Sequence, residues 1–583
     1  MPKDSRSQTG LTVSIGQYSA AGRKPGNQDF HGALVPTGTA LTLKGVVIAI
    51  ADGISSSPVS REAAETVVKS LMTDYYCTSD AWTVKTAASR VISATNSWIY
   101  AQNMRAGIGD MDRGRVTTLS ALILKGRAGH LFHVGDSRIW RVAGDSLEPL
   151  TQDHRVTLSS VESYLGRAMG AERAVEIDYR KIDLVPGDVF LLTTDGVHDH
   201  MDPRFVTAQV RGGDDLDTVA QRIAEQAFQQ GSTDNLTVQI LRVETLADAK
   251  AADLLEAALA LPAPQPPNAG DEIDGFRIQR ALHSNARSHI YRATAPDGQA
   301  VALKIPSVDL RDDPEYLRRF LMEEWIARRL NSAHVLKAAP APETRTALYV
   351  LTEYVEGQTL RQWMTDNPNP DLETWRNMID QIIRGLRVFH RREMLHQDLR
   401  PENIMIDRHG TVKIIDFGST SVAGVQEAAP AVTDDDILGT LQYTAPEYFT
   451  GDPASPRSDQ FSLGVIAYEM LTGRLPYGAK VSRIRSRRDQ RALRYRPARN
   501  DKNAVPDWLD EALERAVNPE PERRYPVLSE FSAAIRAPGA SYKARHKRPL
   551  AERNPVGFWQ SVSAALALVV VVLLVLLVRQ GGG

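Results

Sequence analysis

The most informative motif of the second half of the chain is His396-Gln397-Asp398-Leu399-Arg400-Pro401-Glu402-Asn403. Two further motifs follow it, Asp416-Phe417-Gly418 and Ala445-Pro446-Glu447, and the three together indicate the fold of this half. Asp398 and Asn403 stand five residues apart, and Asp416 ends the apolar run Val412–Ile415. Lys304 lies upstream in the strand-like run Val301-Ala302-Leu303-Lys304. Transfer of a phosphoryl group needs a lysine on the phosphates, oxygen ligands for Mg²⁺ and a carboxylate beside the accepting hydroxyl. These residues occur in the required order.

A second group of acidic residues lies in the first half of the chain, mostly at the ends of short apolar runs. Its members are Asp29, Asp52-Gly53, Asp136, Asp195-Gly196 and Asp234-Asn235. A single Asp-Gly pair is a weak signal because turns use it widely. Five such elements in order are harder to attribute to turns. Oxygen ligands at strand ends suit two hard cations that activate water and hold a phosphate, so the group predicts a binuclear metal site.

Length and composition bound the remaining possibilities. At 583 residues the chain is too long for one hydrophobic core. Its formal net charge is only −2, which argues against nucleic acid as a partner. Cys77 is the one cysteine, so no intramolecular disulfide can form, and we interpret Cys77 as a small buried hydrophobic residue.

Apolar patterning divides the first half into strands and helices. Short apolar runs that end in Gly or Asp turns predict strands at Val46–Ala51, Ser120–Leu124, His130–Val134 and Val189–Thr193. Helical spacing predicts helices at Arg61–Ser70, Thr86–Asn103 and Ala247–Leu261. Leu261–Gly270 is rich in Pro and Ala and predicts a semi-rigid linker, after which strand signals begin near Gly275.

The C-terminal stretch Ser561–Val578 is uncharged and long enough to cross a bilayer. A buried core helix is the alternative, but the stretch has no polar face. Phe558 and Trp559 suit an interfacial position, and basic residues precede them, which places the N-terminal side in the cytoplasm. We predict a tail anchor. The expected segments are a flexible N-terminus (1–12), a first catalytic domain (13–246), a helix and linker (247–271), a second catalytic domain (272–536), a basic connector (537–557) and a transmembrane helix (558–579).

The second half resembles the eukaryotic-like serine/threonine protein kinases over roughly Phe276–Ile535, because its three motifs together form a specific signature. The resemblance implies that Asp398 orients or accepts the substrate proton, that Asn403 and Asp416 bind Mg²⁺, and that Lys304 and Arg400 contact phosphates. It also implies that Glu323 pairs with Lys304, with Glu324 as the fallback, and that Glu353–Val355 forms the hinge that binds adenine. Thr440 would favour Ser/Thr acceptors, and Asp459 and Arg524 would be structural.

Two departures from the kinase pattern concern control and nucleotide binding. His283, Asn285 and Ser288 stand where the family has the glycines of its phosphate loop, so the backbone approaches the phosphates less easily. Gln397 replaces the arginine that normally meets a phosphorylated activation loop, which argues against that form of control.

The first half resembles the metal-dependent type 2C serine/threonine protein phosphatases over about Val13–Val243. The matching strings are Arg23…Asn27-Gln28-Asp29, Ala51-Asp52-Gly53, Thr117-Thr118, Gly135-Asp136-Ser137-Arg138, Thr194-Asp195-Gly196 and Asp234-Asn235-Leu236-Thr237. The resemblance implies that Asp52 bridges two metals, that the Gly53 carbonyl helps to hold one, and that Asp195 and Asp234 ligate the other. Asp29 would act through water, Asp136 would hold a third, weaker metal, and Arg23 would clamp the substrate phosphate.

Three further positions in the first half carry weaker expectations. Gln28 replaces the glutamate of many members, which removes a charge near the second metal. His154 is a candidate general acid, and a structural turn residue is an equal alternative. Ser55–Ser57 replaces a Gly-rich segment and receives no chemical role.

These expectations define a multidomain α+β chain with a phosphatase β-sandwich flanked by helices, a bilobal kinase fold and one transmembrane helix. We expect a bacterial membrane-anchored enzyme that phosphorylates and dephosphorylates protein Ser/Thr, and acts on its own phosphorylation sites. The expected cofactors are ATP and Mg²⁺ or Mn²⁺, with two or three ions in the phosphatase site and one or two in the kinase site. The alternative is a phosphatase regulated by a nucleotide-sensing pseudokinase. A transporter is disfavoured, since one helix forms no pathway.

Overall fold

A computed structural model describes most of the chain. The described residues are 10–108, 111–157, 163–246, 261–284, 287–311, 313–342, 344–428, 442–499, 505–539, 542 and 555–580. They divide into two compact units. The first comprises Met1–Tyr354, Val388–Gln397 and Asp416–Leu438, and the second comprises Val355–Arg387, Asp398–Ile415 and Gly439–Gly583.

Two five-stranded antiparallel sheets form the first part of unit one. One sheet has the strand order β1 (Thr12–Ala20), β12 (Leu236–Thr245), β11 (Val189–Thr193), β6 (Arg138–Ala143), β7 (Ser146–Pro149). The other has the order β10 (Asp178–Asp183), β5 (Ala128–Val134), β4 (Leu119–Lys125), β3 (Val46–Ala51), β2 (Phe30–Leu34). A separate hairpin pairs β8 (Arg155–Thr157) with β9 (Ser163–Leu165).

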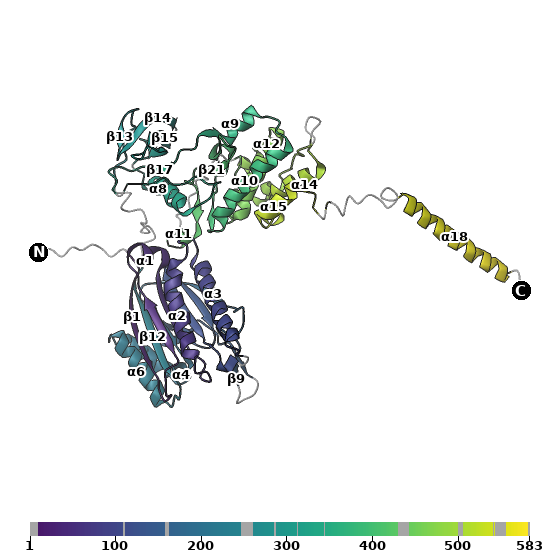
Figure 1. Cartoon of the computed structure of the whole chain (residues 1–583). Coiled ribbons are helices and arrows are strands. Elements are labelled where there is room, and N and C mark those ends of the chain that lie inside the picture. The colour runs from purple at the N-terminus through teal and green to yellow at the C-terminus, as the bar shows by residue number, and fades with distance from the viewer. Residues whose placement is uncertain are drawn as a thin grey trace. The chain divides into compact units, whose positions relative to one another are not determined.

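Alternation of side chains along the strands builds three apolar layers. Ile48 of β3 faces the layer between the sheets, where Phe190 of the other sheet also packs. Ala49, one residue on, faces the outer layer, because successive side chains of a strand point to opposite faces. Helices cover both outer faces (Figure 1). They are α2 (Ser60–Cys77) and α3 (Val84–Arg105) on one face, and α4 (Asp195–His198), α5 (Pro203–Arg211) and α6 (Leu216–Gln229) on the other. Helix α1 (Gly38–Lys44) packs Leu41 against the layer between the sheets, and a 3-10 turn, η1, spans Met111–Arg113. The expected β-sandwich flanked by helices is confirmed.

Unit one also contains a third five-stranded antiparallel sheet, with a helix packed on it. Its strand order is β13 (Glu272–Ile273), β14 (Phe276–Ser284), β15 (Ser288–Thr294), β16 (Ala300–Pro306), β17 (Val350–Glu353). Helix α8 (Pro314–Arg329) packs Phe320 and Leu321 against Val350 of β17. The unit further contains β19 (Met394–Leu395), β22 (Ser421–Val422) and α11 (Ala423–Ala428). This sheet and helix form the smaller lobe of the expected bilobal fold.

Unit two is mainly helical, with one small sheet. The sheet joins β18 (Gly357–Thr359), β20 (Ile404–Asp407) and β21 (Val412–Ile414). Its helices are α9 (Leu360–Asp366), α10 (Leu372–His390), α12 (Pro456–Thr472), α13 (Arg487–Arg491), α14 (Asp507–Ala516) and α15 (Leu528–Arg536), with 3-10 turns η2 (Pro401–Asn403), η3 (Pro446–Phe449), η4 (Gly478–Arg483) and η5 (Pro521–Arg523). Ser455 caps α12 and Pro456 occupies its first turn, which explains where this buried helix begins.

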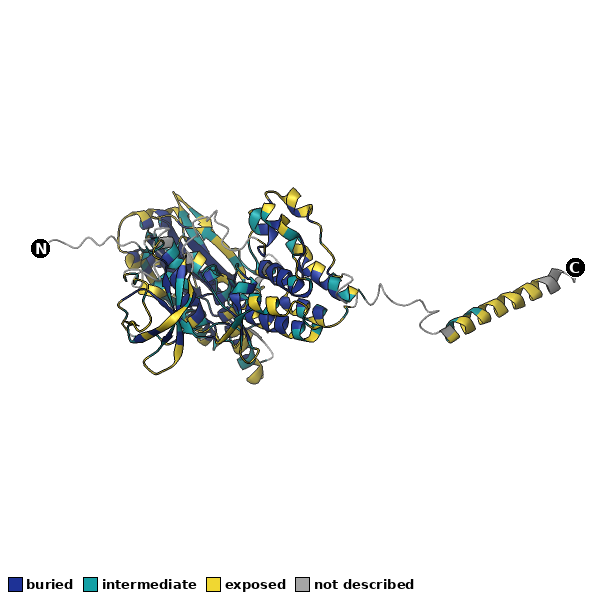
Figure 2. Ribbon diagram, turned by 90° about the horizontal axis from the view of Figure 1, so that it is seen from above, coloured by how far each residue is buried: buried dark blue, intermediate teal, exposed yellow. Residues whose placement is uncertain are grey.

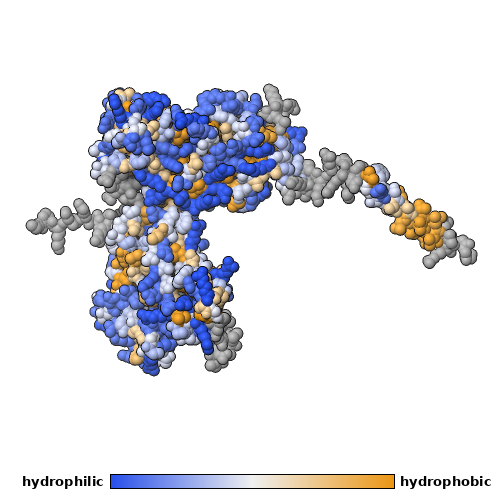
Figure 3. Space-filling model, in the orientation of Figure 1, coloured by the Kyte–Doolittle hydropathy of each residue, from blue (hydrophilic) through white to orange (hydrophobic). Residues whose placement is uncertain are grey.

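Helix α18 (Pro555–Gln580) contains the predicted membrane span. Val556–Leu576 is long and apolar enough to cross a membrane, and none of that window is buried within the protein. Figure 2 shows most of its described residues exposed, and Figure 3 shows their apolar surface. The predicted membrane span therefore coincides with an exposed apolar helix in the described structure.

Observed elements agree closely with the strands expected in the first half. Strand β3 spans Val46–Ala51 and β11 spans Val189–Thr193, as predicted, whereas α2 and α3 extend beyond their predicted ranges. The interpretation of Cys77 is wrong: its side chain is exposed, because it ends α2 away from the face that packs on β3. The helix predicted at 247–261 lies almost wholly outside the described residues.

The start of the predicted linker is attached to the small lobe. The Leu348 N–H donates to the carbonyl of Pro262 at 2.9 Å, and Leu261 packs against the apolar cluster of α8 and β17. This end of the Pro/Ala-rich segment is therefore part of the folded lobe.

Candidate active sites

The acidic residues of the first half lie where strands end. Asp52 follows β3 and Asp136 follows β5, both in one sheet, whereas Asp195 follows β11 and Asp234 precedes β12 in the other. Asp29 immediately precedes β2. The sandwich thus brings together carboxylates that are far apart in sequence.

Burial and the charges of neighbouring carboxylates raise the pKa values of three members of this group. Burial raises the pKa of Asp29 to about 7, and the charge of Asp195 adds to the effect. Burial, followed by the charge of Asp29, holds the pKa of Asp52 well above its usual range. Burial also raises the pKa of Asp195 to about 6, with Asp136 and Asp234 contributing. The cause in each case is desolvation among like charges, which a bound cation relieves.

One carboxylate oxygen in this group is buried without a partner. Asp29 Oδ2 accepts hydrogen bonds from Thr194 Oγ1 at 2.9 Å and Thr237 Oγ1 at 2.6 Å. Asp29 Oδ1 is also buried and has no hydrogen-bond partner in the described structure. Such an oxygen suits a bound water or cation. Within the described ranges, no group of three or more His, Cys, Asp or Glu side chains is arranged so that it could hold a metal ion without rearrangement.

The turn that carries Asp52 is tightly held. The Asp52 N–H donates to Thr118 Oγ1 at 2.9 Å, and the Thr118 N–H donates to the Asp52 carbonyl at 2.8 Å. A Cβ at Gly53 would lie 2.8 Å from the backbone of Ser60, so only glycine fits there. The Asp-Gly pair therefore places a carboxylate and a carbonyl on a rigid strand end.

Two cations that sequence reasoning missed contact the predicted metal ligands. Lys24 Nζ lies 2.6 Å from Asp234 Oδ1. Arg155 donates from Nε to Asp136 Oδ2 at 2.8 Å and from Nη2 to Asp195 Oδ2 at 2.9 Å. Neither residue stands in a recognisable spacing with its partners, so only the folded chain reveals these contacts.

Two residues of the motif around Asp29 lie apart from the carboxylates. The Arg23 guanidinium lies 5.2 Å from the centroid of the Phe228 ring on α6. Gln28 Nε2 donates to the Ser57 carbonyl at 2.8 Å and to Ser60 Oγ at 2.9 Å. Gln28 thus anchors the loop that follows Gly53.

His154 connects the base of the β8–β9 hairpin to the turn before Asp136. The Gly135 N–H donates to His154 Nδ1 at 3.1 Å, which leaves Nε2 to donate to Asp178 Oδ2 at 3.0 Å. Both ring nitrogens are engaged, which supports the structural alternative over the general acid.

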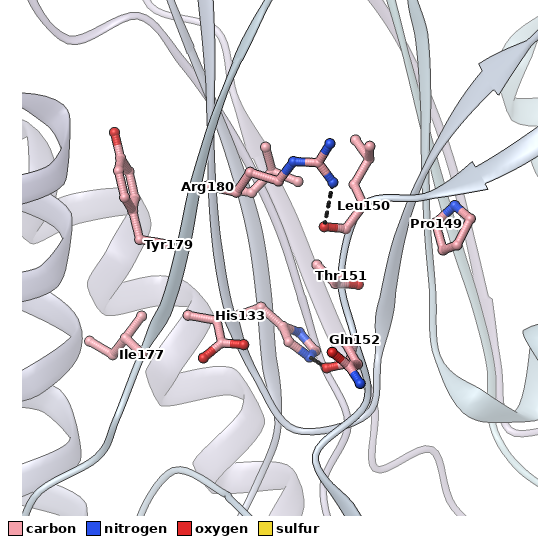
Figure 4. Close-up of a pocket in the computed structure, with 10 residues that line it drawn as sticks. His133, Pro149, Leu150, Thr151, Gln152, Ile177, Tyr179 and Arg180 are labelled. Carbon is pink, nitrogen blue, oxygen red and sulfur yellow. Dashed lines mark hydrogen bonds between the residues drawn. The ribbon is translucent and has the colours of Figure 1, made fainter.

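A surface hollow of about 510 Å³ lies between β5, β10 and the segment before β8 (Figure 4). Arg180 donates to the Leu150 carbonyl at 3.4 Å and His133 Nε2 lies 3.0 Å from the Gln152 carbonyl across it. None of the predicted metal ligands lines this hollow, so it is separate from the carboxylate group.

In the small lobe, Lys304 pairs with Glu323. Alternation along β16 buries Leu303 and Ile305 in the core and turns Lys304 to the opposite face. Its Nζ lies 2.6 Å and 2.8 Å from the two carboxylate oxygens of Glu323. Burial disfavours the charge on Lys304, but Asp416 and Glu323 outweigh it and raise its pKa. The fallback partner, Glu324, instead binds Arg345 at 2.6 Å and also pairs with Arg328.

Asp416 approaches the same lysine. Its Oδ1 lies 3.8 Å from Lys304 Nζ, and its backbone has a φ of 65°, a left-handed conformation that aspartate tolerates better than most residues. A Cβ at Gly418 would lie 2.9 Å from Glu323 Oε1, so glycine leaves room for the ion pair. Phe417 is buried, with its ring 5.4 Å from that of Phe389.

In unit two, the loop before β20 positions Asp398. Asn403 Nδ2 donates to the Asp398 carbonyl at 2.9 Å and to its Oδ2 at 3.0 Å. Arg400 Nε lies 3.7 Å from Asp398 Oδ2. The Ile415 N–H donates to the Asn403 carbonyl at 2.9 Å, which connects the loop to the end of β21.

Other predicted residues of this half have structural surroundings. Glu353 ends β17, where its N–H donates to the Lys337 carbonyl at 2.9 Å, and Val355 is nearly buried. His283 pairs with Ile290 and Ser288 with Pro306 in the sheet. Asn285 and Thr440 lie outside the described residues.

A buried ion pair joins two helical segments of unit two. Arg524 Nη1 and Nη2 donate to the carboxylate oxygens of Glu447 at 2.8 Å and 2.7 Å, and both side chains are essentially inaccessible to solvent. Arg524 also donates to the Asn518 and Arg457 carbonyls. Its donors are therefore largely used within the lobe, as a structural role requires.

Comparisons with known proteins match both halves. The family model of protein phosphatase 2C matches residues 17–239, and that of the protein kinase domain matches residues 277–532. The chain is 28% identical over 286 residues to serine/threonine-protein kinase PrkC of Bacillus subtilis, which covers 48% of this chain and 43% of that protein. It is 33% identical over 219 residues to serine/threonine-protein kinase PknA of Mycobacterium tuberculosis, covering 36% and 50%.

A solved structure of the S. agalactiae serine/threonine phosphatase is 23% identical to this chain, with a TM-score of 0.36. The match covers 40% of this chain and 100% of that one. The chain spans about half the length of the curated relatives it matches.

Proposed function

The chain combines a protein phosphatase 2C domain with a protein kinase domain, and from this premise we propose that it both removes phosphoryl groups from protein Ser/Thr and adds them from ATP. Domains of these families generally use Mg²⁺ or Mn²⁺, and the kinase domain uses ATP. The observation that carries the hydrolytic half is the group of buried and partly buried carboxylates at the ends of both sandwich sheets, where Asp29, Asp52 and Asp195 repel one another.

The residues present in this group fit hard divalent cations. Their donors are carboxylate oxygens and a glycine carbonyl, the ligands that Mg²⁺ and Mn²⁺ prefer, and Asp29 Oδ1 is buried without a partner in the described structure. We propose that Asp52 and the Gly53 carbonyl hold one ion, and that Asp52, Asp195 and Asp234 hold the other. When bound, the two ions would activate water and neutralise the phosphate.

Three further residues would contribute to this site. Asp29 would orient a metal-bound water, and Asp136 would take a third ion. Arg23 would bind the substrate phosphate through its planar fork of donors. Because the Arg23 guanidinium stacks on Phe228, its side chain must turn toward the carboxylates to do so.

Hydrolysis of a phosphorylated peptide tests the first half. We expect release of phosphate that depends on Mn²⁺, stops with chelator and is lost in Asp52→Ala. Activity that persists with chelator, or in Asp52→Ala, would contradict the two-metal mechanism.

The transfer half is supported by the Lys304–Glu323 pair and its approach to Asp416. Lys304 would hold the nucleotide phosphates, with Arg400 assisting, while Asn403 and Asp416 would hold one or two Mg²⁺ ions. Asp398 would receive or orient the hydroxyl proton of the substrate. The backbone of Glu353–Val355 would meet adenine.

Incubation with labelled ATP tests the second half. Label incorporated into protein by the wild type and absent from Asp416→Ala supports transfer. Equal labelling of the two proteins would remove the kinase proposal.

A second candidate function is favoured by the sequence of the β14–β15 turn. His283 and Ser288 flank it in place of glycine, and both are held in the sheet. A kinase domain that binds nucleotide without transferring phosphate would then regulate the phosphatase. A phosphatase rate that changes with ATP while no label is incorporated would favour this alternative.

We also propose that α18 anchors both domains to the cytoplasmic face of a membrane in a bacterium. The support is an exposed apolar helix of sufficient length, preceded by basic residues. The partners would be proteins that carry Ser/Thr or phospho-Ser/Thr, including this chain itself.

A further inference from the structure

The Arg155 guanidinium contacts three carboxylates of the sandwich. Its Nε donates to Asp136 Oδ2 at 2.8 Å and its Nη2 donates to Asp195 Oδ2 at 2.9 Å. A third contact, between Nη1 and Asp199 Oδ2, spans 3.6 Å. One guanidinium therefore spans acidic residues from both sheets, since Asp136 follows β5 and Asp195 follows β11.

The attachment of Arg155 keeps it beside this position. It begins β8, which among the described strands pairs with β9 alone, in a hairpin separate from both sheets. The base of the hairpin is held to the turn before Asp136, because the His154 N–H donates to the Gly135 carbonyl at 2.8 Å. The Gly166 N–H in turn donates to the His154 carbonyl at 2.6 Å. These hydrogen bonds hold the backbone at Arg155 beside the strand end that carries Asp136.

The charges around Arg155 explain why it occupies this place. Burial disfavours its charge, but Asp136, Asp195 and Asp199 outweigh that cost and keep it protonated. Arg155 in turn lowers the pKa of Asp136, against the raising effect of burial. About three tenths of the Arg155 side chain remains exposed, so the contact borders on solvent and is open to exchange.

We propose that Arg155 is a tethered counterion that competes with a divalent cation for Asp136 and Asp195. This inference rests on the proposed phosphatase function and assigns a role to a residue outside its metal ligands. A metal ion on the same carboxylates would lie close to the guanidinium, and two cations at this spacing repel each other. Metal binding at the Asp136 side of the site is therefore weaker while the guanidinium keeps its contacts.

Competition predicts that loss of the guanidinium strengthens metal binding. In Arg155→Met, which keeps an unbranched side chain without charge, we expect the weakest Mn²⁺ site to bind about fivefold more tightly, as removal of one competing, partly exposed ion pair implies. Arg155→Lys keeps the charge but loses the fork of donors, so its affinity should fall between the two.

Isothermal titration with Mn²⁺ measures this directly, with electron paramagnetic resonance of free Mn²⁺ as a second readout. The full chain is used without nucleotide, and every protein carries Asp416→Ala to remove a metal ligand proposed for the kinase half. Arg167→Met is the matched control. Arg167 follows β9 near the same base of the hairpin, where it lies 3.4 Å from His154 Nε2, but it pairs with Asp178 and Glu176 and with none of the predicted metal ligands, so its loss should leave the Mn²⁺ affinities unchanged.

The outcomes separate this proposal from the function on which it rests. Equal or weaker Mn²⁺ binding in Arg155→Met, with circular dichroism like that of the wild type, would overturn the role of Arg155 alone. If Arg155→Met does not fold, the Arg155→Lys titration decides, and an affinity equal to that of the wild type would overturn the proposal. Absence of Mn²⁺ binding in every protein would contradict the metal-dependent phosphatase itself.

Discussion

Lys304 Nζ lies 2.6 Å from Oε1 of Glu323, whereas the adjacent Glu324 pairs with Arg345 and Arg328. Two successive glutamates of α8 thus have different tasks. One faces the strand that carries the lysine, and the other ties the helix to its own lobe.

Substitution of Glu323 by Gln should reduce phosphoryl transfer from ATP about a hundredfold, because a misplaced lysine no longer holds the phosphates. Initial rates of label incorporation measure the effect. Glu324→Gln is the matched control: it should lower the thermal stability of the small lobe while the transfer rate stays within about threefold. An equal loss of transfer in both variants would show that helix integrity, rather than the position of Lys304, governs the reaction.

The stability of the metal-free phosphatase half should fall as pH rises. The folded-state pKa of Asp29 is about 7 and that of Asp195 about 6, both above the ordinary 3.8, so the folded protein binds more protons than the unfolded one between these values. The stabilising contribution is present below about pH 4 and is lost as pH rises through about 6 to 7. Mn²⁺ should therefore raise the unfolding temperature more at about pH 8 than at about pH 5.5.

Thermal unfolding with chelator and with Mn²⁺, over that pH range, tests this dependence. Asp29→Asn should flatten the pH profile of the Mn²⁺-sensitive transition. Asp183→Asn, at an exposed position of β10, should keep the slope of the wild type. An unchanged slope in Asp29→Asn would exclude Asp29 as its source.

Removal of Arg524 should destabilise the larger lobe by about 3–5 kcal/mol, because Glu447 would remain buried and charged without its partner. Denaturant unfolding of Arg524→Met measures the change. The exposed pair Arg499–Asp507 provides the control, since Arg499→Met should cost less than about 1 kcal/mol. Similar losses in the two variants would contradict a special role for the buried pair.

Phosphate on the chain itself should accumulate when the attached phosphatase is inactive. The two domains share one chain and meet at high effective concentration, so Asp195→Ala should raise steady-state phosphorylation severalfold over the wild type. Mass spectrometry of protein purified from cells measures it. The double variant Asp195→Ala/Asp416→Ala should carry none, and equal phosphate on the wild type and Asp195→Ala would exclude action in cis.

A charge in the middle of α18 should release the protein from membranes. Val569→Arg places a guanidinium near the centre of the span at a cost of about 2.5–3.5 kcal/mol. Fractionation of cells, followed by alkaline extraction, measures the distribution. Val569→Leu should remain with the membrane fraction, and a membrane-bound Val569→Arg protein would argue that other segments hold the chain there.

Local patterns predicted the strands well because buried strands consist of apolar residues, which are visible in the sequence. Alternate side chains of Val46–Ala51 fill the layers on the two sides of β3, so the whole run is apolar. Cys77 shows the limit of such reasoning. Its type favours burial, yet its place at the end of α2 turns it to solvent.

Most contacts between distant residues could not be predicted from the sequence. The resemblance to the kinases ranked Glu323 before Glu324 as the partner of Lys304, and the packing of α8 confirms that order. Arg23 belongs to the motif of its family, but its guanidinium lies on Phe228, which is more than two hundred residues away. Lys24, its neighbour, contacts Asp234 instead.

Residue types at short, characteristic spacings predicted the matches to the two family models, their order along the chain and the apolar C-terminal helix. The contacts between charged side chains depend instead on tertiary packing. Arg155 shares oxygens with Asp136 and Asp195 because the hairpin that it begins is held to the strand end that carries Asp136. Such contacts depend on how two sheets and a hairpin pack, and no short stretch of sequence encodes that packing.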